Sequence, residues 1–79
     1  MEQTQLFLLG TEGCHLCEVA FKVLANIGLA EHIVLIDIAE DEKMVEQFGE
    51  RIPVLQDSLT KECLNWPFDE QQVIEWLDN

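Results

Sequence analysis

The hydrophobic pattern of the chain changes period several times, and each change marks the expected border of a helix or strand. An apolar run at residues 6–9, before a glycine-containing turn, predicts a short buried strand over residues 5–9. Between residues 16 and 27 the apolar positions recur at helical spacing, and Gly28 is expected to end this helix. Residues 32–38 are mostly apolar and rich in β-branched side chains without alternation, which predicts a strand covered on both faces.

The middle of the chain predicts a short helix and a hairpin. In residues 40–48 acidic positions precede apolar ones, which is typical of a helix start, and Gly49 is expected to end the helix. Residues 54–56 and 62–65 flank a polar turn and are expected to pair as antiparallel strands.

A last helix is expected at the C-terminus. Asp69 and Gln72 have the spacing of a capping box, with Asp69 at the N-cap. The order is therefore β-α-β-α-β-β-α, which predicts an α/β domain with a mixed four-stranded sheet flanked by three helices. The apolar face of the last helix is assigned to Val73, Ile74, Trp76 and Leu77.

Composition bounds the size and the partners of this domain. The 79 residues, 48% of them apolar, predict a single domain spanning 1–79 with one compact core. Sixteen acidic residues against four basic ones give a net charge of −12. Because nucleic acids and anionic membranes are bound through clustered Lys and Arg, neither is expected as a partner.

Targeting signals and cysteine usage indicate a compartment. We find no apolar run of the roughly 20 residues that a membrane span needs and no basic segment followed by an apolar stretch at the N-terminus. Three cysteines in such a chain fit a reducing cytoplasm, where a C-x-x-C pair is more often redox-active or metal-binding than structural.

The segment Cys14-His15-Leu16-Cys17 carries the chemistry, because it lies where the first strand gives way to the first helix. Two thiols at this spacing can close a disulfide, and the free N–H groups of a helix start stabilise the thiolate of the first. His15 is a candidate modulator, since an imidazolium favours an adjacent anion. A metal half-site and two buried structural thiols are the alternatives; no metal is expected, because structural zinc needs four ligands in paired spacing.

The element order, the C-x-x-C after the first strand and the segment Ile52-Pro53-Val54 at the third strand together resemble the thioredoxin fold in its short, glutaredoxin-like form. The resemblance covers essentially the whole chain and is greatest to small bacterial glutaredoxin-like proteins. It implies a thiol–disulfide oxidoreductase without a cofactor, in which Cys14 is the nucleophile and Cys17 the resolving thiol. It also implies that Pro53 is cis and that Ile52 and Pro53 line the substrate groove.

Three differences from glutaredoxins put glutathione binding in doubt. Thr11 stands where a basic residue usually precedes the motif, Arg51 stands where Thr is usual, and Trp66-Pro67-Phe68 replaces a Gly-Gly turn. We therefore expect a protein disulfide substrate or a protein reductant as the partner, and poor binding of glutathione.

A second reading comes from another class of protein: a thioredoxin-fold module that binds a protein partner without catalysis. Turnover of a disulfide substrate separates the two. Cys63, on the fourth strand, is interpreted as a core residue, as are Trp66 and Phe68, and His32 as structural. The sequence leaves the physiological substrate, the electron donor and the oligomeric state open.

Overall fold

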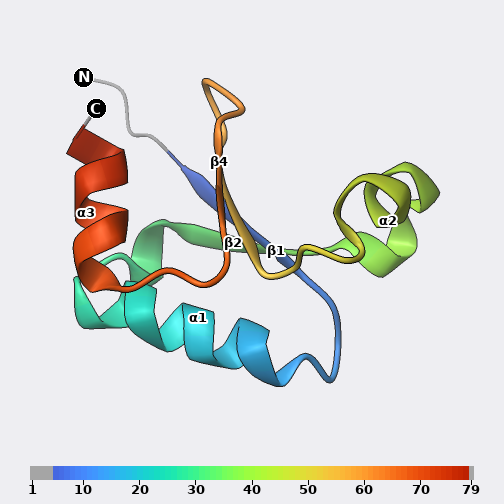
Figure 1. Cartoon of the computed structure of the whole chain (residues 1–79), viewed down its shortest axis with the longest axis horizontal. Helices are drawn as coiled ribbons and strands as arrows, with labels where there is room; N and C mark the ends of the chain where they lie inside the picture. Colours follow the sequence, from blue (N-terminus) through green and yellow to red (C-terminus); the bar gives the residue numbers. More distant parts are fainter. Residues whose placement is uncertain (1–4, 79) are drawn as a thin grey trace.

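A computed structural model of the chain describes residues 5–78 (Figure 1). In this range the helices and strands follow one another in the expected order. They are β1 (Leu6–Gly10), α1 (His15–Asn26), β2 (Ile33–Asp37), α2 (Glu42–Phe48), β3 (Val54–Asp57), β4 (Cys63–Asn65) and α3 (Glu70–Asp78), with short 3-10 turns η1 (Ala30–His32) and η2 (Ile38–Glu40).

The strands form one mixed four-stranded sheet in the order β2-β1-β3-β4. β1 pairs with β2 in parallel and with β3 antiparallel, and β4 pairs antiparallel with β3 as the expected hairpin. β1 extends one residue further than predicted, because Gly10 still pairs with Asp37 of β2. The α/β thioredoxin-like architecture is thus confirmed.

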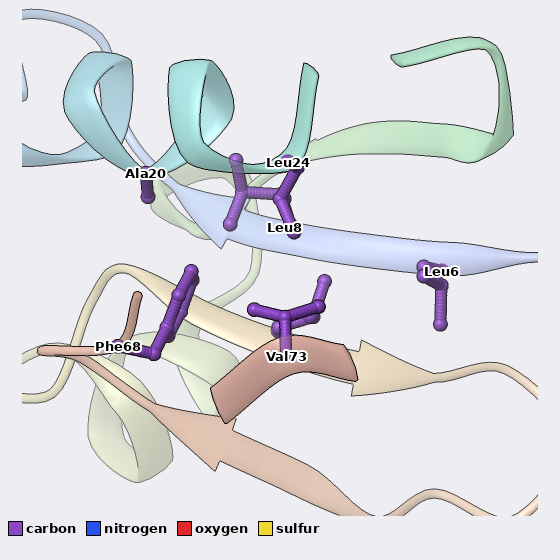
Figure 2. Close-up of a cluster of buried hydrophobic side chains, with 7 residues drawn as sticks. Leu6, Leu8, Ala20, Leu24, Phe68 and Val73 are labelled. Atoms are coloured by element: carbon purple, nitrogen blue, oxygen red, sulfur yellow. The ribbon is translucent and has the colours of Figure 1, made fainter. Parts of the chain in front are cut away.

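The core lies on both faces of the sheet because side chains alternate along each strand. Leu6 and Leu8 of β1 point to the face covered by α1 and α3, where they meet Leu24 and Val73 (Figure 2). The intervening Leu9 belongs to a second cluster on the other face, with Ile38, Phe48 of α2 and Val54. Figure 1 shows the same division, with α1 and α3 adjacent to each other and α2 apart from them.

Local capping bonds set the helix ends where the sequence predicts them. After α1, Gly28 has a positive φ of 79°, its N–H donates to the carbonyl of Ala25 at 3.0 Å, and that of Leu29 donates to the carbonyl of Leu24 at 3.0 Å. This pair of bonds is a Schellman motif, for which glycine is favoured. Before α3, Asp69 accepts from the Gln72 N–H at 2.8 Å, and Gln72 accepts from the Asp69 N–H at 3.1 Å, which confirms the capping box.

Two expectations about burial are wrong. β2 is not covered on both faces: it is an edge strand, and Leu35 is 66% exposed, because α1 and α3 pack over the central strands instead. Of the apolar positions on α3, Val73 is buried and Trp76 packs against the core, whereas Ile74 and Leu77 are exposed. Within residues 5–78 no helix has both the length and the apolar character that a membrane span requires.

Candidate active site

Cys14 and Cys17 lie at the start of α1 and form a disulfide with a Cα–Cα distance of 5.2 Å. This separation is within the usual range for disulfides. Cys14 is the N-cap residue of the helix and Cys17 lies in its first turn, and both are half-buried. The predicted pair is therefore brought together at a helix N-terminus, at the end of β1.

The sulfur of Cys14 takes the place of an N-cap oxygen. The backbone N–H of Cys17 donates a hydrogen bond to Cys14 Sγ at 3.1 Å. In the first turn of a helix such N–H groups have no carbonyl partner within the helix. When the disulfide is reduced, this donor and the positive end of the helix dipole both favour the thiolate of Cys14 over its thiol.

Gly10 is a site residue that the sequence reasoning missed. A Cβ atom at position 10 would lie 2.6 Å from Cys17 Sγ and 3.3 Å from Cys17 Cβ. The last residue of β1 must therefore lack a side chain for Cys17 to pack directly over the strand. A glycine ending a strand just before a C-x-x-C turn is the signal that could have indicated this close approach.

Pro53 lies beside the cysteines by the register of the sheet. Leu9 pairs with Val54, so the next position of the same antiparallel register brings Pro53 opposite Gly10, over which Cys17 packs. The Ile52–Pro53 peptide bond is cis, as the resemblance implied, and Pro53 is fully buried. Ile52 is partly buried and packs against the second core cluster, which contains Leu9 and Phe48.

His15 and Arg51, two candidate charged residues of the site, differ in their hydrogen bonding. His15, the first residue of α1, is exposed, and the described residues give its imidazole no hydrogen-bond partner, so its modulating role stays a prediction. Arg51 is turned toward α2: its Nε and one terminal nitrogen donate to the carbonyl of Gln47 at 3.2 and 3.0 Å, and its guanidinium lies 5.0 Å from the Phe48 ring centroid.

A cavity of about 530 Å³ borders the disulfide. Its walls come from the β1–α1 turn, the first half of α1 and the end of β2. Cys14 and Cys17 both line the cavity. Ile52 and Pro53 are not among the described residues that line it. The disulfide is thus open to a cavity between α1 and the end of β2.

The other residues considered in the sequence lie either in the core or on the surface. Phe68 is buried and Trp66 packs edge-on against it, with ring centroids 5.0 Å apart, so both are core residues as expected. Cys63 is exposed on β4, and its interpretation as a core residue is wrong, because this short edge strand has no cover over that position. His32 is exposed just before β2. Residues 5–78 contain no cluster of three His, Cys, Asp or Glu side chains that could hold a metal ion.

Comparison with known proteins defines the class. The profile of the family described as Glutaredoxin-like domain (DUF836) matches residues 5–78. The chain therefore belongs to this glutaredoxin-like family, as the resemblance indicated.

Two solved structures of bacterial proteins have a similar fold. The crystal structure of protein XcR50 from X. campestris is 36% identical over 92% of this chain and 95% of that one, with a TM-score of 0.83. Protein Ne2328 from Nitrosomonas europaea, solved by NMR, is 25% identical over 96% of this chain and 93% of that one, with a TM-score of 0.81. No curated protein matches the chain significantly. Family and fold thus agree with a cysteine pair placed for thiol–disulfide chemistry.

Proposed function

We propose that the protein is a thiol–disulfide oxidoreductase that uses Cys14 as nucleophile and Cys17 as resolving thiol. The observation that carries the proposal is the position of the pair: the two sulfurs are joined at the N-terminus of α1, and a backbone N–H of the helix points at Cys14 Sγ from 3.1 Å. An inert structural disulfide gains nothing from a thiolate-stabilising helix end, whereas an exchanging one does.

The reaction proceeds in two exchanges. The Cys14 thiolate attacks one sulfur of a substrate disulfide, and the other substrate sulfur leaves as a thiolate that takes a proton from water. The Cys17 thiol then loses its proton and attacks Cys14 Sγ, which releases the second substrate thiol. The substrate has gained two electrons and two protons, and the protein is left with the Cys14–Cys17 disulfide. A dithiol or thiol reductant restores the reduced protein by the reverse exchange.

The partner is a protein disulfide or a protein reductant, and the segment of Pro53 supports the site from the neighbouring strand. Opposite Gly10 in the register, Pro53 is next to the strand position that Cys17 covers. The role of Ile52 is then to hold the proline segment through its packing against the core. This activity suits a reducing compartment such as the cytoplasm, where the exposed thiol of Cys63 stays free.

Reduction of insulin disulfides with dithiothreitol as donor tests the proposal. Wild type and the matched control Cys63→Ser are expected to accelerate the reaction over the donor alone. Cys14→Ser is expected to abolish the acceleration, and Cys17→Ser to accumulate a mixed disulfide that mass spectrometry detects. Stable association of wild type with a disulfide substrate without turnover would instead support a non-catalytic binding module.

A further inference from the structure

The walls of the cavity beside the disulfide are mostly apolar. Phe21 of α1 and Leu35 and Ile36 of β2 contribute to it, together with the two cysteines. Its volume of about 530 Å³ falls in the range of ligand pockets. It is therefore large enough to take a bulky apolar side chain next to the reacting sulfurs.

The exposure of Leu35 shows where this cavity lacks a cover. Leu35 is 66% exposed on an edge strand that has β1 as its single neighbour in the described sheet. A large aliphatic side chain on the wall of a pocket loses its contact with water when an apolar group enters. Occupation of the cavity by an apolar side chain is thus favourable at this wall.

The rim of the cavity is acidic. Glu12, Glu18 and Asp37 lie on it and are exposed, and Lys22 is the one basic residue among the described residues that line it. The chain as a whole carries a net charge of −12. An approaching group with positive charge is attracted both by the rim and by the field of the whole molecule, whereas an acidic group is repelled.

From these observations we infer that the cavity between α1 and β2 is a specificity site for the polypeptide that exchanges with Cys14. Its occupant is a segment of the protein substrate in which a large apolar side chain lies next to Lys or Arg. The apolar side chain enters between Phe21 and Leu35, and the basic side chains contact the acidic rim. This inference rests on the proposed disulfide exchange and adds the class of substrate to it.

Four short peptides test this site by separating the apolar from the charged contribution. Each contains one disulfide, with either Phe or Ser beside the cysteine and either two Lys or two Glu next to it. Reduction by reduced wild-type protein is followed by thiol mass tagging, alongside a small uncharged disulfide reagent. We expect the Phe–Lys peptide to react about tenfold faster than the Ser–Glu peptide, because burial of one apolar side chain alone is worth at least that factor. The rate advantage of the Lys peptides over the Glu peptides is expected to become smaller at high salt.

Variants of two exposed leucines test whether the preference for Phe peptides arises at the cavity. Leu35→Gln is expected to reduce the preference for Phe peptides over Ser peptides severalfold. Leu59→Gln is the matched control, because Leu59 is 61% exposed in the β3–β4 turn and does not line the cavity. Equal rates for the four peptides, or a preference that Leu35→Gln leaves unchanged, would overturn the specificity site while leaving the exchange reaction intact. Failure of wild type to reduce the small uncharged disulfide would overturn the proposed function itself.

Discussion

A side chain at position 10 has no room at the site, because Cys17 packs directly over the backbone of Gly10. The Cβ of an alanine there would lie 2.6 Å from Cys17 Sγ. In the oxidised protein this sulfur is bonded to Cys14 and cannot rotate away, whereas in the reduced protein it can. A side chain added at position 10 is therefore expected to destabilise the oxidised form more than the reduced form.

We predict that Gly10→Ala lowers the unfolding free energy of the oxidised protein by about 1–3 kcal/mol, the usual cost of overpacking, and that of the reduced protein by less. Urea denaturation of both forms measures the difference. In a Cys17→Ala background, which removes the sulfur, the same substitution is expected to cost less than in the oxidised wild-type background. A cost that is equal in oxidised and reduced wild-type backgrounds would contradict the packing described at Gly10.

The second prediction at this scale concerns the ionisation of Cys14. In the reduced protein we expect the pKa of the Cys14 thiol to lie below the free value of about 8.5, because the start of α1 and the Cys17 N–H stabilise the thiolate. The rate of exchange should then rise with pH through this lowered pKa and level off above it. Thiolate absorbance against pH, with Cys14→Ser as the control, measures the value. Titration at or above the free value means that Glu12 and Glu18 outweigh the helix start.

At the scale of helices and strands, the sequence predicted best where a local bond decides the structure. The capping box of Asp69 and Gln72 and the glycine end of α1 depend on residues a few positions apart, so their pattern is visible in the chain. The cysteine pair was predictable for the same reason. The burial of β2 and the exposure of Cys63 depend on which helix covers which strand, and no local pattern specifies that.

The position of β2 at the edge of the sheet can be tested by comparing two leucines. Leu35→Gln is expected to change the unfolding free energy by no more than about 0.5 kcal/mol, as surface substitutions usually do, since Leu35 is mostly exposed. Leu24→Ala is expected to cost about 2–5 kcal/mol, because Leu24 of α1 is fully buried in the core. Chemical denaturation of both variants measures this, and a cost at Leu35 comparable to that at Leu24 would mean that β2 is covered after all.

At the scale of the whole molecule, the net charge of −12 acts against anionic partners, glutathione among them. Arg51, the basic residue nearest Pro53 in the sequence, already donates to the carbonyl of Gln47. The acidic residues that line the cavity beside the disulfide have the same sign as the overall charge. The charges around the cysteines therefore favour neutral or basic partners.

We predict that glutathione binds weakly. Titration of the oxidised protein with S-methylglutathione, which cannot exchange thiols, should leave the backbone amide signals nearly unmoved in NMR spectra. Arg51→Ala should change this little, because one exposed charge contributes roughly 0–1 kcal/mol. Saturable shifts at Ile52, Pro53-adjacent amides and Asp69 that disappear in Arg51→Ala would show a glutathione site that the charge argument missed.

The central claim is that Cys14 and Cys17 exchange reversibly between dithiol and disulfide, and a redox titration tests it most directly. The Cys63→Ser variant, which keeps the pair and removes the third thiol, is equilibrated in a series of dithiothreitol and glutathione buffers and read by thiol mass tagging. The account predicts one reversible two-electron transition in which both thiols are tagged or neither is. A pair that stays in one state across the whole series, or that is oxidised irreversibly, would contradict it.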